Sequence, residues 1–305
     1  GISLKNYAYS LKKLNPNLVI LLGDRYETFS FAIASMFLKF PIAHIGGGET
    51  TLGAIDENLR HSITKMSYIH FVYHDIYKKR IMQMGEDPKK IYNYGSIGSE
   101  NISKLKFKSK KAIEKKFKFN FLKKNLLITF HPSTLEKESP NKQFEKILKS
   151  LDLLKDTFLI FTSSNIDLGG QQINKMINLY TKINKHKSIF IPSMGQTFYF
   201  SSLKHIDALI GNSSSGIYET AQFKIGVVNI GKRQKGRLQN KNIINCEPNF
   251  IAISKAIKKL YSYKFQLKLR KIKDNFDKKN TVDNIYNKIK SVKLPKNLYK
   301  PFFDI

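Results

Sequence analysis

Short apolar runs alternate with helix-like segments along most of the chain. In the first third the apolar runs lie at 17–22, 41–45 and 68–73, and the segments between them, 28–38 and 56–66, carry apolar residues at helical spacing. Strands that are joined through helices pair in parallel. The alternation therefore predicts an α/β fold built on doubly wound parallel sheets.

A second set of strand-like runs follows, and these are near-continuously apolar, as expected of parallel strands covered on both faces. They lie at 126–130, 157–162, 188–191, 207–211 and 227–230. A lysine-rich polar segment over 103–124, without a strand pattern, separates the two sets. We therefore expect two Rossmann-like domains: a partial N-terminal one over 1–108, and a C-terminal one over 109–305 whose amphipathic helices over 250–291 pack back on the first.

The net charge of +30 raises the question of nucleic-acid binding, because dense cations gain affinity by releasing counterions from phosphates. Lysine supplies 47 of the 53 cations and arginine only six, and the lysines are spread over nearly every predicted helix. An RNA groove would favour planar arginine forks. The composition thus favours a solvated lysine-rich surface without nucleic acid, and a basic surface also suits anionic small substrates.

Nothing in the sequence predicts a membrane partner. The apolar runs are strand-sized, far below the ~20 residues of a membrane-spanning helix. No basic segment followed by an apolar one opens the sequence, and the single cysteine, Cys246, cannot form an internal disulfide. We therefore expect a cytoplasmic protein.

Charged residues follow the first two predicted strands, where open α/β sheets bind their ligands. Asp24 and Arg25 follow the first strand in GDRYET, although Asp24 is equally suited to cap the next helix. The second strand leads into three glycines, 46–48, and then Glu49. Glycines allow the backbone to approach a ligand closely, and the alternative is a flexible turn. The run lacks the GxGxxG pattern, so a dinucleotide fingerprint is absent.

The helix predicted from Asp56 carries further charges. Asp56 and Arg60 are four residues apart, as are Glu57 and His61, which places each pair on one helix face. Surface helices carry such pairs routinely. Their position near the strand-end carboxylates favours a functional role.

In the second half, His131 follows a strand in HPST and is held extended by Pro132. The motif GNSSSGIYETA follows the strand at 207–211. It begins a helix with several hydroxyl groups, which predicts an anion site that suits diphosphate. An ordinary serine-capped helix is the alternative. Glu219 is then placed to accept hydrogen bonds from a ribose. Arg233 and Arg237, in GKRQKGR, either add phosphate contacts or cover a surface loop.

Five motifs together carry a resemblance to a known family. GDRYET, HIGGGETTLGAIDENLRHSITK, TFHPST, GNSSSGIYETAQF and NIGKRQKGR, in this order, resemble the UDP-N-acetylglucosamine 2-epimerase family, most closely its hydrolysing branch, which feeds sialic and legionaminic acid synthesis. The resemblance implies a two-domain fold of the glycosyltransferase-B type, often dimeric, with the nucleotide sugar bound between the domains. It implies no metal and no redox cofactor.

The resemblance also implies roles for individual residues. The catalytic residues it implies are Asp24, Glu49, Asp56 and His131, the last near the diphosphate. The substrate and UDP contacts it implies are Arg25, Arg60, His61, Ser213, Ser214, Ser215, Gly216, Glu219, Arg233 and Arg237.

Two features depart from the family pattern. Many members carry a glutamate where this chain has Gly46, so that role has either moved to Glu49 or is missing. The family also begins with a strand and a glycine-threonine-arginine loop that nothing before Asn17 supplies. We therefore expect a first domain that is N-terminally incomplete by about seventy residues of a doubly wound sheet.

The implied reaction converts UDP-GlcNAc, or a UDP-2,4-diacetamido-trideoxyhexose, and water into UDP and the free 2-epimeric sugar of the N-acetylmannosamine type. A 2-acetamidoglucal is the implied intermediate. The alternatives are a non-hydrolysing epimerase that gives UDP-ManNAc and a UDP-sugar glycosyltransferase of the same fold. From a different class, a catalytically inactive sugar-nucleotide sensor or basic scaffold is a further alternative.

Overall fold

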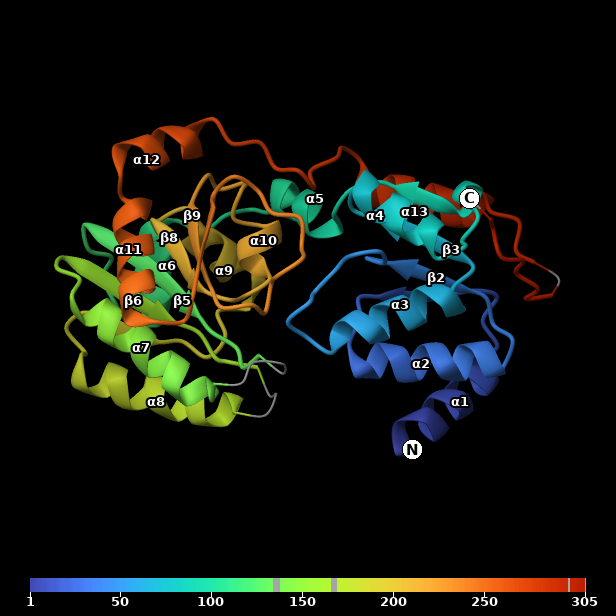
Figure 1. Cartoon of the computed structure of the whole chain (residues 1–305), viewed down its shortest axis with the longest axis horizontal. Helices are drawn as coiled ribbons and strands as arrows, with labels where there is room; N and C mark the ends of the chain where they lie inside the picture. The colour runs from blue at the N-terminus through green and yellow to red at the C-terminus, as the bar shows by residue number, and fades with distance from the viewer. Residues whose placement is uncertain (134–137, 166–168, 296, 305) are drawn as a thin grey trace. The chain divides into compact units, whose positions relative to one another are not determined.

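A computed structural model describes residues 1–133, 138–165, 169–295 and 297–304. The described chain forms two compact units, each with its own parallel sheet (Figure 1). Unit 1 comprises Gly1–Thr51, Ile55–Glu100 and Phe276–Ile305, and unit 2 comprises Leu52–Ala54 and Asn101–Asn275. The predicted α/β fold with parallel sheets is confirmed. Among the described residues, no helix is both long and apolar enough to span a bilayer.

Unit 1 is built from short strands that alternate with helices. Its elements are α1 (Ile2–Leu14), β1 (Val19–Leu22), α2 (Tyr26–Phe37), β2 (Ile42–Ile45), α3 (Asp56–Met66), β3 (Ile69–Val72), α4 (Asp75–Gln83), the 3₁₀ turn η1 (Pro88–Lys90), β4 (Ile91–Asn93) and α13 (Thr281–Ser291). A further helix, α5 (Ile97–Lys104), spans the division between the units.

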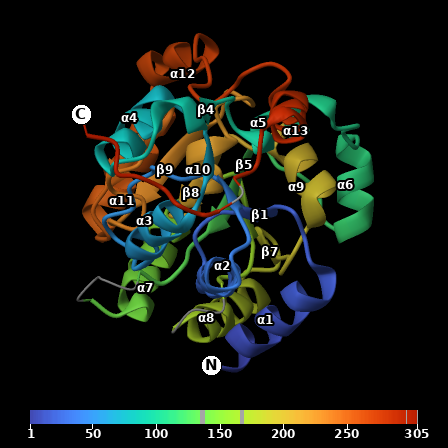
Figure 2. The same cartoon turned by 90° about the vertical axis from the view of Figure 1, so that its right-hand side faces the viewer.

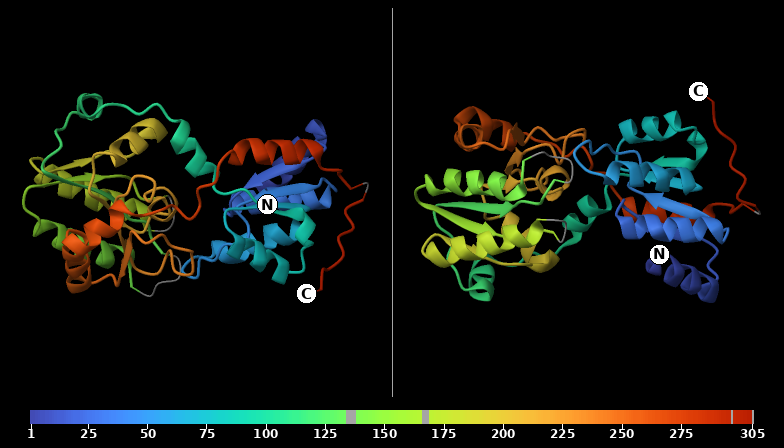
Figure 3. Two further views of the ribbon diagram at one scale, coloured as in Figure 1. Left: turned by 90° about the horizontal axis from the view of Figure 1, so that it is seen from above. Right: turned by 60° about the horizontal axis from the view of Figure 1, so that its bottom comes forward.

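The strands of unit 1 pair in parallel in the order β1-β2-β3-β4. One face of the sheet packs on α1, α2 and α3 through a hydrophobic cluster that includes Leu11, Leu21 and Ile63. The other face packs on α13 through Phe71 and Ile285, and Figure 3 shows this helix beside the strands. The C-terminal helix therefore completes unit 1.

Unit 2 contains a longer series of strands and helices. Its elements are α6 (Lys110–Phe117), β5 (Lys124–Thr129), α7 (Pro140–Asp152), β6 (Thr157–Phe161), α8 (Gly170–Ile183), β7 (Ser188–Phe190), α9 (Gly195–Leu203), β8 (Ala208–Gly211), α10 (Ser215–Tyr218), β9 (Gly226–Ile230), β10 (Ile243–Cys246), α11 (Phe250–Leu260) and α12 (Tyr263–Arg270).

The strands of unit 2 pair in parallel in the order β10-β9-β8-β5-β6-β7. Because β5 comes first in the chain and β8 lies beside it, the strand order reverses direction between these two strands. In doubly wound sheets this switch point is where ligands bind, beyond the carboxyl ends of the strands. A ligand-binding site in unit 2 is therefore expected at the residues that follow β5 and β8.

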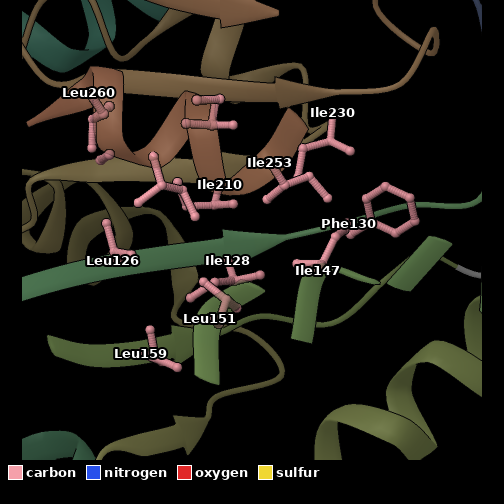
Figure 4. Close-up of a cluster of buried hydrophobic side chains, with 14 of the residues drawn as sticks. Leu126, Ile128, Phe130, Ile147, Leu151, Leu159, Ile210, Ile230, Ile253 and Leu260 are labelled. Carbon is pink, nitrogen blue, oxygen red and sulfur yellow. The ribbon is translucent and has the colours of Figure 1, made fainter. Parts of the chain in front are cut away.

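Alternating side chains of the unit 2 strands enter two separate cores. Leu126, Ile128 and Phe130 point to the face covered by α7 and α11, as Figure 4 shows. Leu127 points to the opposite face, where α6 and α9 lie side by side (Figure 2). Coverage of both faces explains why these strands are apolar at nearly every position.

The segment over 103–124 is part of unit 2, and the units divide at Glu100, ahead of the predicted boundary at 108. Helix α6 lies within this segment and buries Ile113, while Phe119 and Phe121 pack into the same core. Lysines outnumber these few buried residues, and this is why the sequence pattern of the segment is polar.

A buried carboxylate, that of Glu86, anchors the C-terminal tail on unit 1. It accepts hydrogen bonds from His70 Nε2 at 3.0 Å, Lys65 Nζ at 2.8 Å and Lys300 Nζ at 2.9 Å. Lys300 also donates to the backbone carbonyls of Lys65 and Ser67. Burial acts to raise the pKa of Glu86, but these hydrogen bonds prevail and lower it to about 2.

Replacing Glu86 by glutamine is expected to lower the free energy of unfolding by about 3 kcal/mol at pH 7, because buried His70 and two lysines lose a charged acceptor that is itself buried. A carboxyl with a depressed pKa stabilises the fold above its unfolded pKa, near 4.5, and this contribution is lost as the pH falls toward 2. Urea unfolding at pH 7, 4.5 and 3 should therefore show that the difference in unfolding free energy between Glu86→Gln and wild type becomes smaller as the pH falls.

Glu138→Gln is the matched control, since Glu138 pairs with Lys146 on the surface and both side chains are one-third exposed. Its loss should stay within about 0.5 kcal/mol. Equal losses in the two variants would contradict the anchoring role of Glu86.

Candidate active site

The guanidinium of Arg60, on α3, is the centre of the polar network in unit 1. Its side chain is fully buried, and Nε and Nη2 both donate to Asp24 Oδ2, the former at 2.8 Å. Nη1 donates to Glu57 Oε2 at 3.0 Å and to the carbonyl of Glu49 at 3.1 Å. Nη2 also donates to Thr51 Oγ1 at 2.7 Å. One side chain thus joins the turn after β1, the loop after β2 and the start of α3.

The hydrogen bonds of Arg60 all go to acceptors within the protein. A guanidinium has five N–H groups, and five hydrogen bonds from Arg60 go to protein acceptors. None of them goes to Asp56, the i–4 partner that the helical spacing predicted. The arrangement gives Arg60 five protein acceptors, and the contact between Arg60 and the substrate stays a prediction.

Glu57 is a second member of the network, and it was not among the predicted site residues. Its carboxylate accepts from the backbone N–H of Thr51, from Arg60 and, at 3.2 Å, from His61 Nε2. Burial acts to raise the pKa of Glu57, but the hydrogen bonds from His61 and Thr51 and the charge of Arg60 lower it to about 2. Glu57 is therefore ionised at neutral pH, and the predicted contact between Glu57 and His61 is present.

Of the three predicted carboxylates in unit 1, Asp24 bonds Arg60 through its side chain and Glu49 through its backbone carbonyl. Asp24 directly follows β1 and is part-buried against Arg60. Glu49 is buried, at 4% exposed, in the loop after β2. Asp56 is the first residue of α3, one turn before Arg60. Arg25 precedes α2 and makes a long ion pair, 3.9 Å, with Glu27, where both side chains are about 40% exposed or more.

Gly46 cannot be replaced by the glutamate of the family pattern without rearrangement. Its φ is +89°, and a Cβ there would lie 2.9 Å from the hydroxyl oxygen of Tyr73. In this chain Tyr73 occupies the space that a side chain at position 46 would enter.

In unit 2 the side chain of Asn212, directly after β8, joins the strand ends at the switch point. Its Oδ1 accepts from the backbone N–H of His131 at 2.7 Å, and its Nδ2 donates to the carbonyl of His131 at 2.8 Å. The carbonyl of Asn212 accepts from Arg233 Nη1 at 3.1 Å and from Gln234 Nε2 at 2.8 Å. Three predicted motifs therefore meet at one asparagine, which the sequence did not single out.

His131 has a defined tautomer when neutral. Its Nδ1 accepts a hydrogen bond of 3.0 Å from the backbone N–H of Asn165, so the ring proton is carried by Nε2. Nε2–H is a suitable donor to a phosphate oxygen. Thr134, the last residue of TFHPST, lies outside the described residues.

The serine motif forms a single helical turn and not a full helix. Helix α10 spans only Ser215–Tyr218, so its dipole is small, and any anion bound here would depend on hydroxyl and backbone N–H groups. Ser213 Oγ accepts from the N–H of Ser215, Ser214 is exposed, and Gly216 is buried. Serine capping and an anion site are both compatible with this turn.

The side chains of Glu219, Ser215 and Tyr199 lie together in unit 2. Burial raises the pKa of Glu219, against a hydrogen bond from Ser215. The hydroxyl of Tyr199 also bonds Ser215 Oγ, and burial together with the charge of Glu219 raises the pKa of Tyr199. Arg237 places its guanidinium over the ring of Tyr218, 5.3 Å from the centroid.

Leu52–Ala54, in the segment between β2 and α3, belong to unit 2. The backbone N–H of Leu52 donates to the carbonyl of Lys235 at 2.8 Å, and Ser133 Oγ donates to the carbonyl of Gly53 at 3.0 Å. These contacts lie beside the HPST and GKRQKGR motifs. No set of three or more metal-ligating side chains is grouped together within the described ranges.

Arg60→Met is expected to lower the free energy of unfolding by about 3 to 5 kcal/mol, because it removes the cation that the carboxylates of Asp24 and Glu57 share. Urea unfolding at pH 7 measures this loss. Arg25→Met removes an exposed ion pair and should lower the free energy of unfolding by no more than about 0.5 kcal/mol. Similar losses in both variants would contradict the central position of Arg60.

His44, on β2, is expected to make stability depend on pH. Burial lowers its pKa to about 4, with His70 and Arg60 acting in the same direction and the Gly23 carbonyl and Asp24 opposing. The unfolded chain takes up this proton below pH 6.5, so wild type should lose about 3 kcal/mol relative to His44→Gln between pH 6.5 and 4. A pH-independent difference in unfolding free energy between the two proteins would refute this.

Comparison with known proteins places the chain in a family. The sequence model for UDP-N-acetylglucosamine 2-epimerase matches residues 1–290. The chain is 43% identical over 266 residues to "GDP/UDP-N,N'-diacetylbacillosamine 2-epimerase (hydrolyzing)" of Campylobacter jejuni, covering 87% of this chain and 69% of that relative. It is 38% identical to "Polysialic acid biosynthesis protein P7" of Escherichia coli, covering 94% of this chain and 73% of that one.

Solved structures share the fold. The UDP-GlcNAc 2-epimerase from Neisseria meningitidis, bound to UDP-GlcNAc, matches with a TM-score of 0.79 at 16% identity, over 95% of this chain and 80% of that one. The S. aureus MnaA–UDP structure matches with a TM-score of 0.76 at 15% identity, over 94% and 79%. The predicted glycosyltransferase-B type fold is confirmed, and the chain belongs to the UDP-N-acetylglucosamine 2-epimerase family.

Proposed function

We propose that this chain is a hydrolysing 2-epimerase of a UDP-linked 2-acetamido sugar. It converts UDP-GlcNAc, or a UDP-2,4-diacetamido-trideoxyhexose, and water into UDP and the free 2-epimeric sugar. The observation that carries the proposal is the Arg60 network, which holds Asp24, the loop of Glu49 and the first turn of α3, where Asp56 lies, together in a chain of this family. The relative at 43% identity, which is named as hydrolysing, supports the hydrolytic outcome.

The chemistry explains why several carboxylates are needed. The proton on C2 has no adjacent carbonyl carbon to acidify it, so it is removed as the C1–oxygen bond to the diphosphate breaks. The electron pair of that bond leaves with UDP, and a 2-acetamidoglucal remains. Water then adds its oxygen to C1 while C2 is reprotonated from the opposite face. Acids and bases are therefore required on both sides of the ring.

Unit 1 supplies the proton-transfer residues in this proposal. Asp24 and Asp56 act as the acid and base, and Glu49 is the candidate for the role of the family glutamate absent at Gly46. Each positioned acid or base contributes about 10²- to 10⁴-fold to such reactions. Arg60 holds the Asp24 carboxylate in place.

Unit 2 supplies the leaving-group site. His131 Nε2–H, the hydroxyls of Ser213 and Ser214 and the guanidinium of Arg233 bind the departing diphosphate and stabilise its developing charge. Glu219 accepts hydrogen bonds from the ribose hydroxyls. The polar network around Asn212, which orients His131 and Arg233, supports this assignment.

We also infer that the enzyme is a cytoplasmic homodimer. The family resemblance supports the dimer, and the single cysteine is consistent with a reducing compartment. Light scattering on the purified protein tests the dimer directly: a monomeric mass at micromolar concentration would exclude it.

Incubation with UDP-GlcNAc in D₂O distinguishes the alternatives. The hydrolysing epimerase should release UDP together with a free N-acetylmannosamine-type sugar that carries deuterium at C2, as read by NMR and mass spectrometry. A non-hydrolysing epimerase would place the deuterium in a UDP-linked product, and a glycosyltransferase would release UDP without any label at C2. Either outcome would rule out the proposed reaction.

Asp24→Asn and Asp56→Asn test the assigned residues, and each is expected to lower kcat by at least about 10²-fold. Asp75→Asn is the control, because Asp75 lies at the start of α4 and bonds Asn93. If the protein is an inactive sensor, it will bind UDP but show no turnover, and the two substitutions will have no effect on kcat.

A further inference from the structure

The imidazole of His44 is buried in the middle of unit 1 with both ring nitrogens engaged. Its Nε2 lies 2.9 Å from the carbonyl oxygen of Gly23, and its Nδ1 lies 3.2 Å from Thr64 Oγ1. A carbonyl can only accept, so Nε2 carries the proton and Nδ1 accepts from the threonine hydroxyl. His44 is therefore a neutral ring that bridges α3 and the residue before Asp24.

Gly23 is fixed by β2 on both of its polar groups. Its N–H donates to the carbonyl of Ile45 at 3.0 Å, which continues the parallel ladder, and its carbonyl accepts from His44. The carbonyl of Gly23 and the N–H of Asp24 belong to one planar peptide group. The orientation of the His44 ring therefore sets the direction in which the chain presents Asp24.

Helix α3 holds this turn at two points. Arg60 and Thr64 are four residues apart and lie on the same helix face. Arg60 binds the carboxylate of Asp24 directly, and Thr64 acts on the backbone beside it through His44. Because α3 also begins with Asp56, the two contacts fix the turn that bears Asp24 relative to the helix that bears the other proposed carboxylate.

The glycine loop packs tightly against the same pair. A Cβ at Gly47 would lie 2.9 Å from Thr64 Oγ1 and 3.0 Å from His44 Nδ1. Only a glycine lets the backbone of this loop pass so close to the hydrogen bond between the two side chains. The loop, the turn and the helix are thus packed around one imidazole.

We propose that His44, together with Thr64, is a positioning residue for Asp24 in the epimerisation reaction. It touches neither the substrate nor the reacting atoms, and it acts by fixing the Gly23–Asp24 peptide. This inference rests on the proposed function, in which Asp24 transfers a proton. A displacement of about 1 Å in such a group is enough to cost about 10²-fold in rate.

Steady-state kinetics with UDP-GlcNAc test the proposal on a set of variants. His44→Leu, which keeps volume but removes both polar contacts, should lower kcat about 10²-fold and leave KM and UDP affinity unchanged. His44→Gln, which restores a donor toward Gly23, should recover most of that loss. Thr64→Val should lower kcat by a smaller factor. His70→Gln is the matched control, because His70 is the buried register neighbour of His44 on β3 but bonds Glu86.

Unchanged kcat in His44→Leu, or an equal loss in His70→Gln, would overturn the positioning role. A circular dichroism spectrum like that of wild type shows that a variant is folded, and Thr64→Val decides the matter if His44→Leu does not fold. If wild type gives no turnover, the proposed function fails. Amide hydrogen exchange of the peptide over 19–27 then tests the positioning claim alone: faster exchange in His44→Leu than in His70→Gln supports it, and identical exchange overturns it.

Discussion

The buried guanidinium of Arg60 is the interaction on which the architecture of unit 1 depends. Burying an unpaired cation would cost several kcal/mol, and this cost is offset because every N–H group has a protein acceptor. Those acceptors come from three separate segments, so the ends of β1, β2 and the start of α3 are held together. Two carboxylates, Asp24 and Glu57, share this one cation, and Glu57 stays ionised with a pKa of about 2.

In unit 2 a neutral side chain, that of Asn212, holds the strand ends together. Asn212 offers both a donor and acceptors, so it joins the ends of β5 and β8 to the following basic loop without burying a charge. This suits a region proposed to receive a diphosphate, where a buried protein carboxylate would repel the ligand. A network centred on a guanidinium in unit 1 and one centred on an amide in unit 2 match the proposed separation of proton transfer from leaving-group binding.

The sequence predicted the strands and their functional ends well, because apolar runs that end in glycine or a charged residue are local signals. It did not predict α1, whose only fully buried residue is Leu11, and it placed a polar linker where Ile113 enters a core. Short edge strands such as β10 were also missed, since four residues carry little pattern.

Long-range contacts were beyond the reach of sequence patterns. The spacing of α3 predicted that Arg60 would face Asp56, but its partners come mainly from loops that the fold brings near. The sequence pattern placed His44 in a strand and gave no sign that its ring links the turn before Asp24 to α3. Lys300 reaches Glu86 from the far end of the chain, and no local pattern predicts such a contact.

The most direct test of this account is the affinity for UDP, measured by calorimetric titration of wild type, Asp24→Asn and Glu219→Gln. If unit 1 performs proton transfer and unit 2 binds the nucleotide, Asp24→Asn should bind UDP as wild type does, and Glu219→Gln should bind it about tenfold more weakly or worse. Loss of UDP binding in Asp24→Asn together with full binding in Glu219→Gln would contradict the account.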